Sequence, residues 1–315
     1  MARKQPGTDR CRLVVVTGKG GVGKTTVAAA TTLALARRGR DTVAAELAGQ
    51  SRIPGLLGGA SSGRPGFEAE IAPETWATVI DPEGALAEWA GQIVRPRAVL
   101  ELAIRSRAFS GFVAAAPGAS ELISITKASE LSSPDRWVPG APAHDVAVLD
   151  APASGHGLGL LQSPRTYAEI ARVGPIATQA REVDELLRDP ERCMIITVAI
   201  PEETPVNEAG ELAALLEERL GRGPSLMVMN SMVDGGLSES EAERARRSAG
   251  ATAPTAMLAA DRRLELANRQ EAQLERLRAL SPAPVLVLPS LGPAGATPDG
   301  VETLAGILGP ALEPG

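Results

Sequence analysis

The chain has 315 residues, of which 44% are hydrophobic and 22% are charged, and its formal net charge is −6. This is an ordinary globular composition, and the acidic balance argues against a general nucleic-acid-binding or anionic-membrane surface. No apolar run approaches the roughly 18 residues of a spanning helix, and the polar start at residues 1–10 predicts a flexible N-terminus without a signal peptide.

The first predicted elements enclose a glycine-rich loop. The apolar run Arg12–Thr17 predicts a strand, and the alanine-rich run Val27–Arg37 predicts a helix. Between them stand Gly18, Lys19, Gly20, Gly21, Val22, Gly23, Lys24, Thr25 and Thr26, which satisfy the phosphate-loop pattern G-x-x-x-x-G-K-[ST]. Glycines allow backbone N–H groups to turn toward phosphate oxygens, and the helix dipole adds positive potential. We expect Lys24 to bridge the β- and γ-phosphates and Thr25 to ligate Mg²⁺.

A second lysine, Lys19, stands at the start of this loop. It marks a deviant form of the motif, found in dimeric nucleotide switches whose signature lysine reaches the nucleotide of the partner subunit. An ammonium group attracts phosphate much more strongly in a closed, water-poor interface than at an open surface. Such a lysine therefore favours dimer closure around ATP and stabilises charge on the departing γ-phosphoryl group. A solvated surface lysine is the alternative interpretation.

The next part of the chain alternates strand and helix signals. Strands are predicted at Thr42–Leu47 and Ala77–Ile80, separated by a Gly/Ser/Pro-rich loop at Gly55–Gly66. Residues 83–138 lack a strong strand signal and follow helical spacing, as do residues 158–190. We interpret them as a helical insertion and a helical segment on the nucleotide side of the sheet, within a single domain spanning residues 11–315. These helices either form a client-binding groove or pack as ordinary helices of the domain.

A strand predicted at Asp145–Leu149 leads into a second acidic motif. Asp150 stands where a Walker-B aspartate would hold Mg²⁺, directly or through water. Gly155 follows five residues later, and its N–H group is expected to contact the γ-phosphate and to move on hydrolysis. We interpret His156 as a hinge or packing residue and His144 as a surface residue.

The remaining elements complete an α/β pattern, a mostly parallel sheet flanked by helices. The predicted strands are Cys193–Ala199, Ser225–Met229 and Pro284–Leu288, and the predicted amphipathic helices are Asn207–Leu220 and Arg262–Leu280. Asn230 and Pro289 directly follow two of these strands, and ligands of such sheets bind at the carboxyl ends of strands. We assign both to the nucleotide-binding set. Asn230 either reads the adenine edge with its amide or initiates a turn.

These residues resemble the arsenite-pump and tail-anchored-protein-targeting ATPase family. The phosphate loop is shared across a wider class that includes Min and partition ATPases and nitrogenase iron protein, whereas the segment Asp150–His156 resembles this family's second switch. Further similarity lies in Ser163-Pro164-Arg165, Gly174-Pro175-Ile176, Pro201–Val206, Asn230 and Ala116-Pro117-Gly118, and the resemblance spans Leu13 to Leu288. It implies a homodimer, or a heterodimer with a related ATPase, that closes on ATP and Mg²⁺ and acts on a protein client.

One departure from the family pattern concerns hydrolysis. The family's first switch usually carries an aspartate that positions the attacking water, and the corresponding position here is Ala48. Glu46 is the nearest carboxylate, but a two-residue shift along a strand moves the group by several ångströms. We therefore predict slow hydrolysis, with Glu46 as the candidate catalytic acid or with the acid supplied by a partner subunit.

A second departure concerns sulfur. Cys11 and Cys193 are typical of the reducing cytoplasm, and no pair has the spacing for an interfacial zinc or an arsenite site. The leading hypothesis is a cytoplasmic, ATP-driven switch on a protein client. The alternatives are a non-catalytic scaffold subunit that binds ATP, and a Min- or partition-type positioning ATPase. The last is disfavoured because the C-terminus lacks a basic amphipathic helix and the chain lacks a DNA-binding patch.

Overall fold

The computed structural model describes residues 10–47, 49, 51–60, 64–93, 118–233, 240–241, 243–244 and 254–312. Several sequence predictions lie outside these residues, namely the flexible N-terminus, the first-switch position Ala48 and residues 94–117 of the helical insertion. Across the described ranges, no helix combines the length and the apolarity that crossing a bilayer requires.

The described strands form one eight-stranded sheet with the order β3-β4-β2-β5-β1-β6-β7-β8. They are β1 (Leu13–Gly18), β2 (Thr42–Leu47), β3 (Ala69–Ala72), β4 (Thr75–Ile80), β5 (Val146–Asp150), β6 (Cys193–Ala199), β7 (Leu226–Met232) and β8 (Val285–Pro289). All pairings are parallel except that of the edge strand β3 with β4. The predicted mostly parallel α/β sheet is confirmed, and β3 was not predicted.

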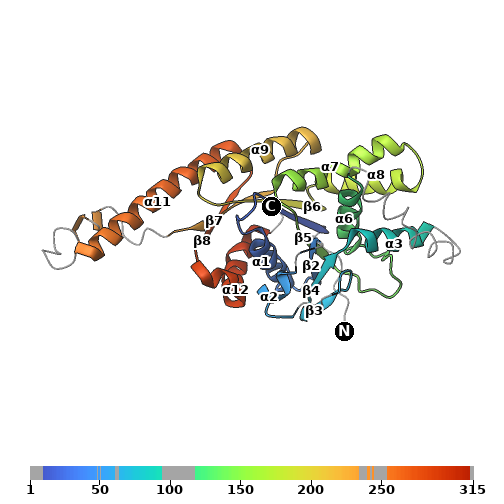
Figure 1. Ribbon diagram of the computed structural model, residues 1–315, viewed down its shortest axis with the longest axis horizontal. Helices are drawn as coiled ribbons and strands as arrows, with labels where there is room; N and C mark the ends of the chain where they lie inside the picture. Colours follow the sequence, from blue (N-terminus) through green and yellow to red (C-terminus); the bar gives the residue numbers. More distant parts are fainter. Residues whose placement is uncertain are drawn as a thin grey trace.

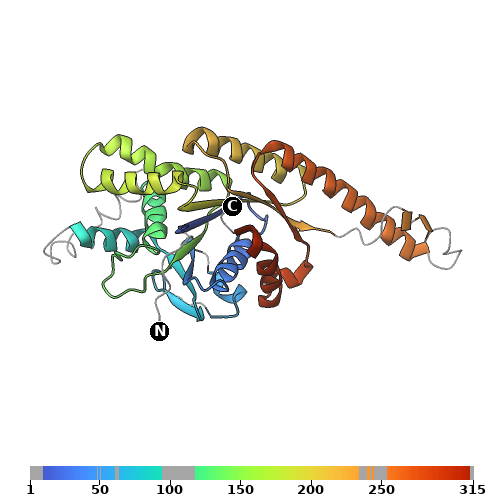
Figure 2. The same cartoon turned by 180° about the vertical axis from the view of Figure 1, so that it is seen from behind.

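Helices cover both faces of the sheet (Figure 1). They are α1 (Lys24–Ala36), α2 (Ile53–Leu56), α3 (Pro82–Ile93), α6 (Ala119–Glu130), α7 (Ser154–Ala171), α8 (Pro175–Arg188), α9 (Glu203–Leu220), α11 (Pro254–Leu280) and α12 (Pro298–Leu308), with 3₁₀ turns η2 (Gly292–Ala296) and η3 (Gly309–Leu312). Helices α1, α2 and α12 lie on one face, and α6 to α9 lie on the other. The long helix α11 packs beside α9 and projects beyond the body of the molecule, as the view from behind also shows (Figure 2).

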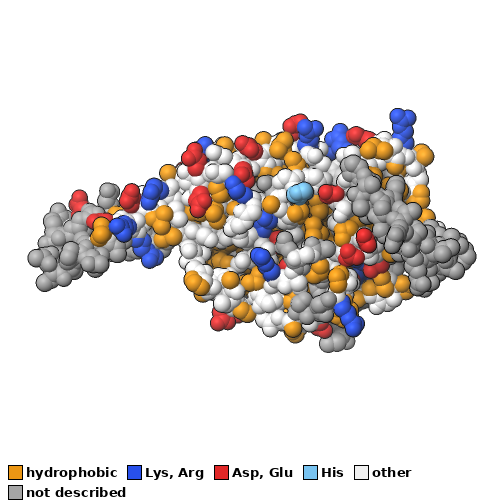
Figure 3. Space-filling model, viewed as in Figure 1, with side chains coloured by type: hydrophobic (Ala, Val, Ile, Leu, Met, Phe, Trp, Pro, Cys, Tyr) orange, Lys and Arg blue, Asp and Glu red, His pale blue; other side chains and the backbone are white. Residues whose placement is uncertain are grey.

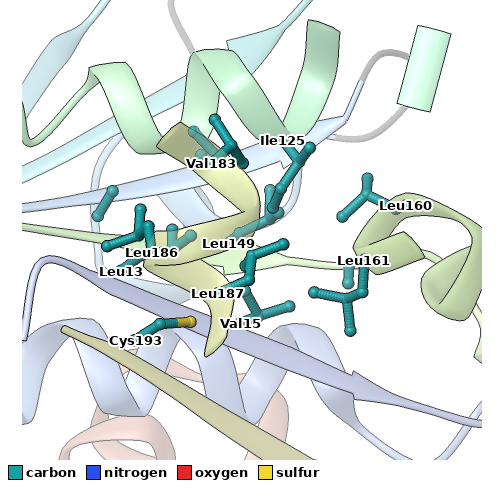
Figure 4. Close-up of a cluster of buried hydrophobic side chains, with 14 of the residues drawn as sticks. Leu13, Val15, Ile125, Leu149, Leu160, Leu161, Val183, Leu186, Leu187 and Cys193 are labelled. Carbon is teal, nitrogen blue, oxygen red and sulfur yellow. The ribbon is translucent and has the colours of Figure 1, made fainter. Parts of the chain in front are cut away.

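Alternation along the strands explains why both faces are covered. Leu13 and Val15 of β1 point into a core shared with α6, α7, α8 and α9, part of which Figure 4 shows. Val14 and Val16 point into the opposite core, shared with α1 and α12. Because successive side chains of a strand point to opposite faces, a continuously apolar strand requires helices on both sides.

The predicted helical segment at 158–190 is two helices rather than one. Helix α7 ends at Ala171 and α8 begins at Pro175. Between them, Arg172 has a φ of 51° and Gly174 a φ of 94°. These left-handed conformations end α7, and Pro175 suits the first turn of the next helix.

His144 is buried, so its interpretation as a surface residue was wrong. Its Nδ1 lies 2.5 Å from Asp41 Oδ1, and its Nε2 lies 2.9 Å from Glu68 Oε2. Arg136 also contacts Glu68, at 2.5 Å, and contacts Glu130 Oε1 at 2.9 Å. We call these five side chains, together with Lys127 and Glu88, the buried charge network.

The rest of the buried charge network links the two insertion helices α3 and α6. Lys127 of α6 donates to Glu88 of α3 at 2.7 Å and to Glu130 at 2.8 Å. The Lys127 ammonium also lies 5.4 Å from the centre of the Trp137 ring. Asp41 and His144 precede β2 and β5, so the network lies at the amino ends of these strands.

Candidate functional site

The glycine loop joins the carboxyl end of β1 to the first residue of α1. Gly18 has a φ of 143°, and a Cβ atom there would lie 2.3 Å from the carbonyl oxygen of Val198. Gly23 has a φ of 91°, and a Cβ atom there would lie 2.4 Å from Nδ2 of Asn230. Both ends of the loop therefore require glycine, for backbone conformation and for space.

Lys24 folds back along this loop. Its Nζ donates to the carbonyl oxygen of Lys19 at 2.9 Å. Burial lowers the pKa of the Lys24 ammonium, and the negative charge of Asp150 opposes that effect. A lysine held in this position can transfer its hydrogen bond from the loop to a phosphate oxygen.

Thr25 and Asp150 meet at the neighbouring strand end. The Thr25 hydroxyl donates to Asp150 Oδ2 at 2.6 Å. Asp150 is 6% exposed, and its other oxygen, Oδ1, is buried without a hydrogen-bond partner among the described residues. Burial raises the pKa of this carboxyl to about 6, against the opposing effects of Thr25 and Lys24. An unsatisfied carboxylate oxygen beside a hydroxyl fits the oxygen ligands that Mg²⁺ prefers.

Glu46 lies on β2 beside Asp150 of β5, where the two residues are partners in the parallel register. Its side chain is buried, and its two oxygens accept hydrogen bonds from the backbone N–H groups of Arg52, at 2.8 Å, and Ile53, at 3.0 Å. The carboxylate therefore caps the start of the short helix α2. Both of its oxygens are engaged in this structure, which leaves its catalytic role a prediction.

The glycines of the predicted second switch lie in the first turn of α7. Gly155 is exposed, and a Cβ atom there would meet nothing within 4 Å. Gly157 is buried, and its Cβ would lie 2.7 Å from Thr17 Oγ1 and 2.9 Å from the carbonyl oxygen of Pro152. This close approach of α7 to β1 was not predicted, although Gly157 belongs to the same motif as Gly155. His156 is exposed beside them.

A cavity of ≈ 260 Å³ lies beside the loop. Its lining includes the predicted residues Gly21, Val22, Gly23, Thr26, Asn230 and Pro289. The sequence reasoning missed Ser231, Ser290, Leu291, Gly292, Gly295, Ala296 and Leu304. The strand-end rule that selected Pro289 applies equally to the loop that follows it, so this signal could have located the rest.

Lys19 and Glu208 form an ion pair between the loop and α9. The Lys19 Nζ lies 2.8 Å from Glu208 Oε1, and the two side chains are 34% and 32% exposed. Lys19 is thus held near the surface by a contact within the chain. The contact of Glu208 with Lys19 could not be predicted from a sequence motif, because it depends on how α9 packs.

Parallel strands that end at a glycine loop and at a neighbouring aspartate characterise the P-loop nucleoside triphosphatases, and this chain has that fold. The family model described as "Anion-transporting ATPase" matches residues 11–177, more than half of the chain. The chain therefore belongs to the anion-transporting ATPase family, whose members bind nucleotide.

Individual relatives agree with this assignment. The chain is 28% identical over 242 residues to a putative arsenical pump-driving ATPase of Halobacterium salinarum, covering 71% of this chain and 36% of that protein. It is 31% identical over 215 residues to ATPase BagA of Mycobacterium tuberculosis, covering 64% and 59%. It is 30% identical over 223 residues to the arsenical pump-driving ATPase of Escherichia coli, covering 70% and 34%. The alignments thus span between about a third and three fifths of these relatives' lengths.

Proposed function

We propose that this chain is an ATPase that binds ATP with Mg²⁺, hydrolyses it slowly, and pairs with a second related subunit when nucleotide is bound. Pairing acts in the cytoplasm as a switch on a protein client. The observation that carries the proposal is the contact of Thr25 with Asp150, whose second oxygen is buried and unsatisfied next to Lys24.

Each site residue has a distinct role in this proposal. Lys24 and the loop amides hold the phosphates, and Thr25 and Asp150 hold the metal ion. When bound, Mg²⁺ neutralises phosphate charge. Gly155, at the exposed start of α7, senses the γ-phosphate, and the cavity lined by Asn230 accepts the base.

Slow turnover is supported by the engagement of Glu46. Because each of its oxygens already accepts a backbone hydrogen bond at the start of α2, Glu46 is held in place and is not free to move toward the nucleotide and orient water. We expect slow product formation in a single-turnover assay of the purified chain, and a change of less than about 3-fold in Glu46→Gln. The lost cap should lower stability by about 1 kcal/mol.

Three outcomes of this assay would change the proposal. Fast turnover abolished by Glu46→Gln would make Glu46 the catalytic acid. Fast turnover unaffected by that change would contradict both versions. No product over hours would favour the second candidate, a non-catalytic scaffold that binds ATP, which the engagement of Glu46 also supports.

Pairing is expected to depend on Lys19. Lys19→Ala should leave ATP affinity of the monomer nearly unchanged but weaken dimerisation with a non-hydrolysable ATP analogue by about 10-fold or more, because a cation facing phosphate in a closed interface is lost. Sedimentation velocity measures this.

The matched control for Lys19 is Glu208→Gln. It removes the partner in the same subunit but keeps the lysine, and a partly exposed ion pair is worth about 0–1 kcal/mol. It should leave dimerisation unchanged or strengthen it by up to about 5-fold. Equal dimerisation of the wild-type and Lys19→Ala chains would rule out the role of Lys19 in pairing.

A protein client is favoured over arsenite. Cys193 begins β6 and Cys11 precedes β1, so both lie at the amino ends of strands, opposite the nucleotide site. Burial raises the pKa of Cys193 to about 12, which keeps its thiol protonated. On the face shown in Figure 3, Lys and Arg side chains are interspersed with Asp and Glu, which supports a partner other than nucleic acid.

A further inference from the structure

We infer that Asn230 is a positioning residue that holds the phosphate loop in its binding conformation. The inference rests on the proposed nucleotide site. Its basis is a hydrogen bond of 2.9 Å from Asn230 Nδ2 to the carbonyl oxygen of Val22, in the middle of the loop.

The asparagine side chain is fixed at both of its polar atoms. While Nδ2 donates to Val22, Oδ1 accepts from the backbone N–H of Ser231 at 2.9 Å. Ser231 has a φ of 62°, a left-handed conformation that the hydrogen bond to Oδ1 helps to hold. Two opposed bonds set the plane of the amide, and turning the side chain away from the loop would break both.

Because Asn230 is buried, loss of its hydrogen bond to the loop would be costly. Asn230 is 7% exposed, and its Nδ2 occupies the space 2.4 Å from where a Cβ on Gly23 would lie. The amide therefore packs directly on the last glycine before Lys24. Removal of Nδ2 would leave the buried Val22 carbonyl without its partner and open space beside the loop. Asn230 thus connects the end of β7 to the backbone that must surround the phosphates.

The two roles of Asn230 predict different ligand dependence. A base-reading residue affects ATP but not inorganic tripolyphosphate, which has no base. A residue that shapes the loop affects both ligands by the same factor. We therefore expect Asn230→Ala to weaken both Mg-ATP and Mg-tripolyphosphate by about 10-fold, measured by calorimetry.

Several results would overturn the inference. Loss of ATP affinity alone would make Asn230 the base-reading residue, and unchanged affinity for both ligands would remove it from the site. A wild-type chain that binds ATP but not tripolyphosphate would also contradict it, because the effect acts through the phosphates. A wild-type chain that binds neither ligand would overturn the proposed function as well.

The matched control is Asn268→Ala. Asn268 is an exposed asparagine on α11, and its replacement should change neither affinity.

Asn230→Asp keeps the inference testable if the alanine variant does not fold. This variant retains the shape and the oxygen that faces Ser231, but its carboxylate cannot donate to the Val22 carbonyl, whereas the protonated carboxyl can. Relative to wild type at the same pH, its tripolyphosphate affinity should be about 10-fold weaker near about pH 8.5 and recover near about pH 5.5. A ratio that stays constant with pH would count against a hydrogen bond to the loop.

Discussion

Lys24→Ala should lower the affinity for Mg-ATP by roughly 100-fold or more, measured by isothermal titration calorimetry. Lys24 is half-buried at the start of α1, where its ammonium donates to the loop carbonyl of Lys19. Hydrogen bonds from a cation to phosphate are among the strongest in proteins, and two or more of them account for a loss of this size. The same substitution removes the positive charge beside Asp150.

The control for this prediction is the other lysine of the loop. Lys19 pairs with Glu208 of the same chain, so Lys19→Ala should leave the affinity of the monomer within about 3-fold. Circular dichroism would confirm that both variants fold. Unchanged affinity in Lys24→Ala would contradict the assignment of the loop, whatever the behaviour of Lys19.

Arg136→Ala should lower the free energy of unfolding by about 3–5 kcal/mol. The Arg136 side chain is 4% exposed and contacts Glu68, Glu130 and the carbonyl oxygen of Pro142. Its removal leaves two carboxylates buried without this cation, and the desolvation cost of each is then poorly offset. Urea denaturation measures the effect. Arg165→Ala, which breaks an exposed pair with Glu169, should cost at most about 0.5 kcal/mol.

Nucleotide affinity distinguishes the expected effect of Arg136→Ala from that of Lys24→Ala. The buried charge network lies at the amino ends of β2 and β5, whereas the proposed nucleotide site lies at their carboxyl ends. Arg136→Ala should therefore destabilise the chain while its folded form binds Mg-ATP as wild type does. A cost below about 1 kcal/mol would show that the network is solvated rather than buried.

The pH dependence of unfolding tests the same network through its histidine. Burial lowers the pKa of His144, but its hydrogen bonds and proximity to Asp41 and Glu68 outweigh burial, so the pKa lies above 6.5. The stabilisation from protonated His144 is complete below about pH 6.5 and is lost as the pH rises through the folded-state pKa. Burial raises the pKa of Glu68, but His144 and Arg136 outweigh it and hold the pKa below 4.5. Its contribution is present above about pH 4.5 and is lost as the pH falls through the lower folded-state pKa.

The network should therefore be most stabilising between about pH 4.5 and 6.5. His144→Gln should remove the decline on the alkaline side, so the stability curves of the two chains should converge as the pH rises. Curves that stay parallel as the pH rises above about 6.5 would show that His144 does not titrate as its contacts require.

Strand positions were predictable because they depend on local patterns. The apolar runs of β1 and β5 require cover on both faces, and they end at Gly18 and Asp150, which belong to recognisable motifs. Edge strand β3 was not predicted because it has only four residues, Ala69–Ala72, and is partly exposed. Its strand conformation depends on pairing with β4, which the local sequence does not reveal. The break after Arg172 could have been predicted, because Gly174 and Pro175 follow it closely and a Gly-Pro dipeptide is a helix-breaking signal.

The site residues that belong to local motifs were likewise predictable, and those that depend on contacts between distant elements were not. Thr25 and Asp150 were predicted from motifs and lie in contact, 125 positions apart. Gly157 was missed because its need for glycine comes from a close approach to Thr17 of another element. The hydrogen bond of Asn230 to Val22 could not be predicted, because the amide can equally face a base or a backbone carbonyl.

The amino-acid sequence by itself determined the α/β architecture, the phosphate loop and the identity of the metal-binding candidates, because short-range patterns of apolar residues, glycine and charge encode them. Only the tertiary structure decided the partners of the polar groups: Glu46 caps α2, Lys19 pairs with Glu208, and His144 is buried between two carboxylates. The physical reason is that a polar side chain has several acceptable partners, and packing of distant elements selects among them.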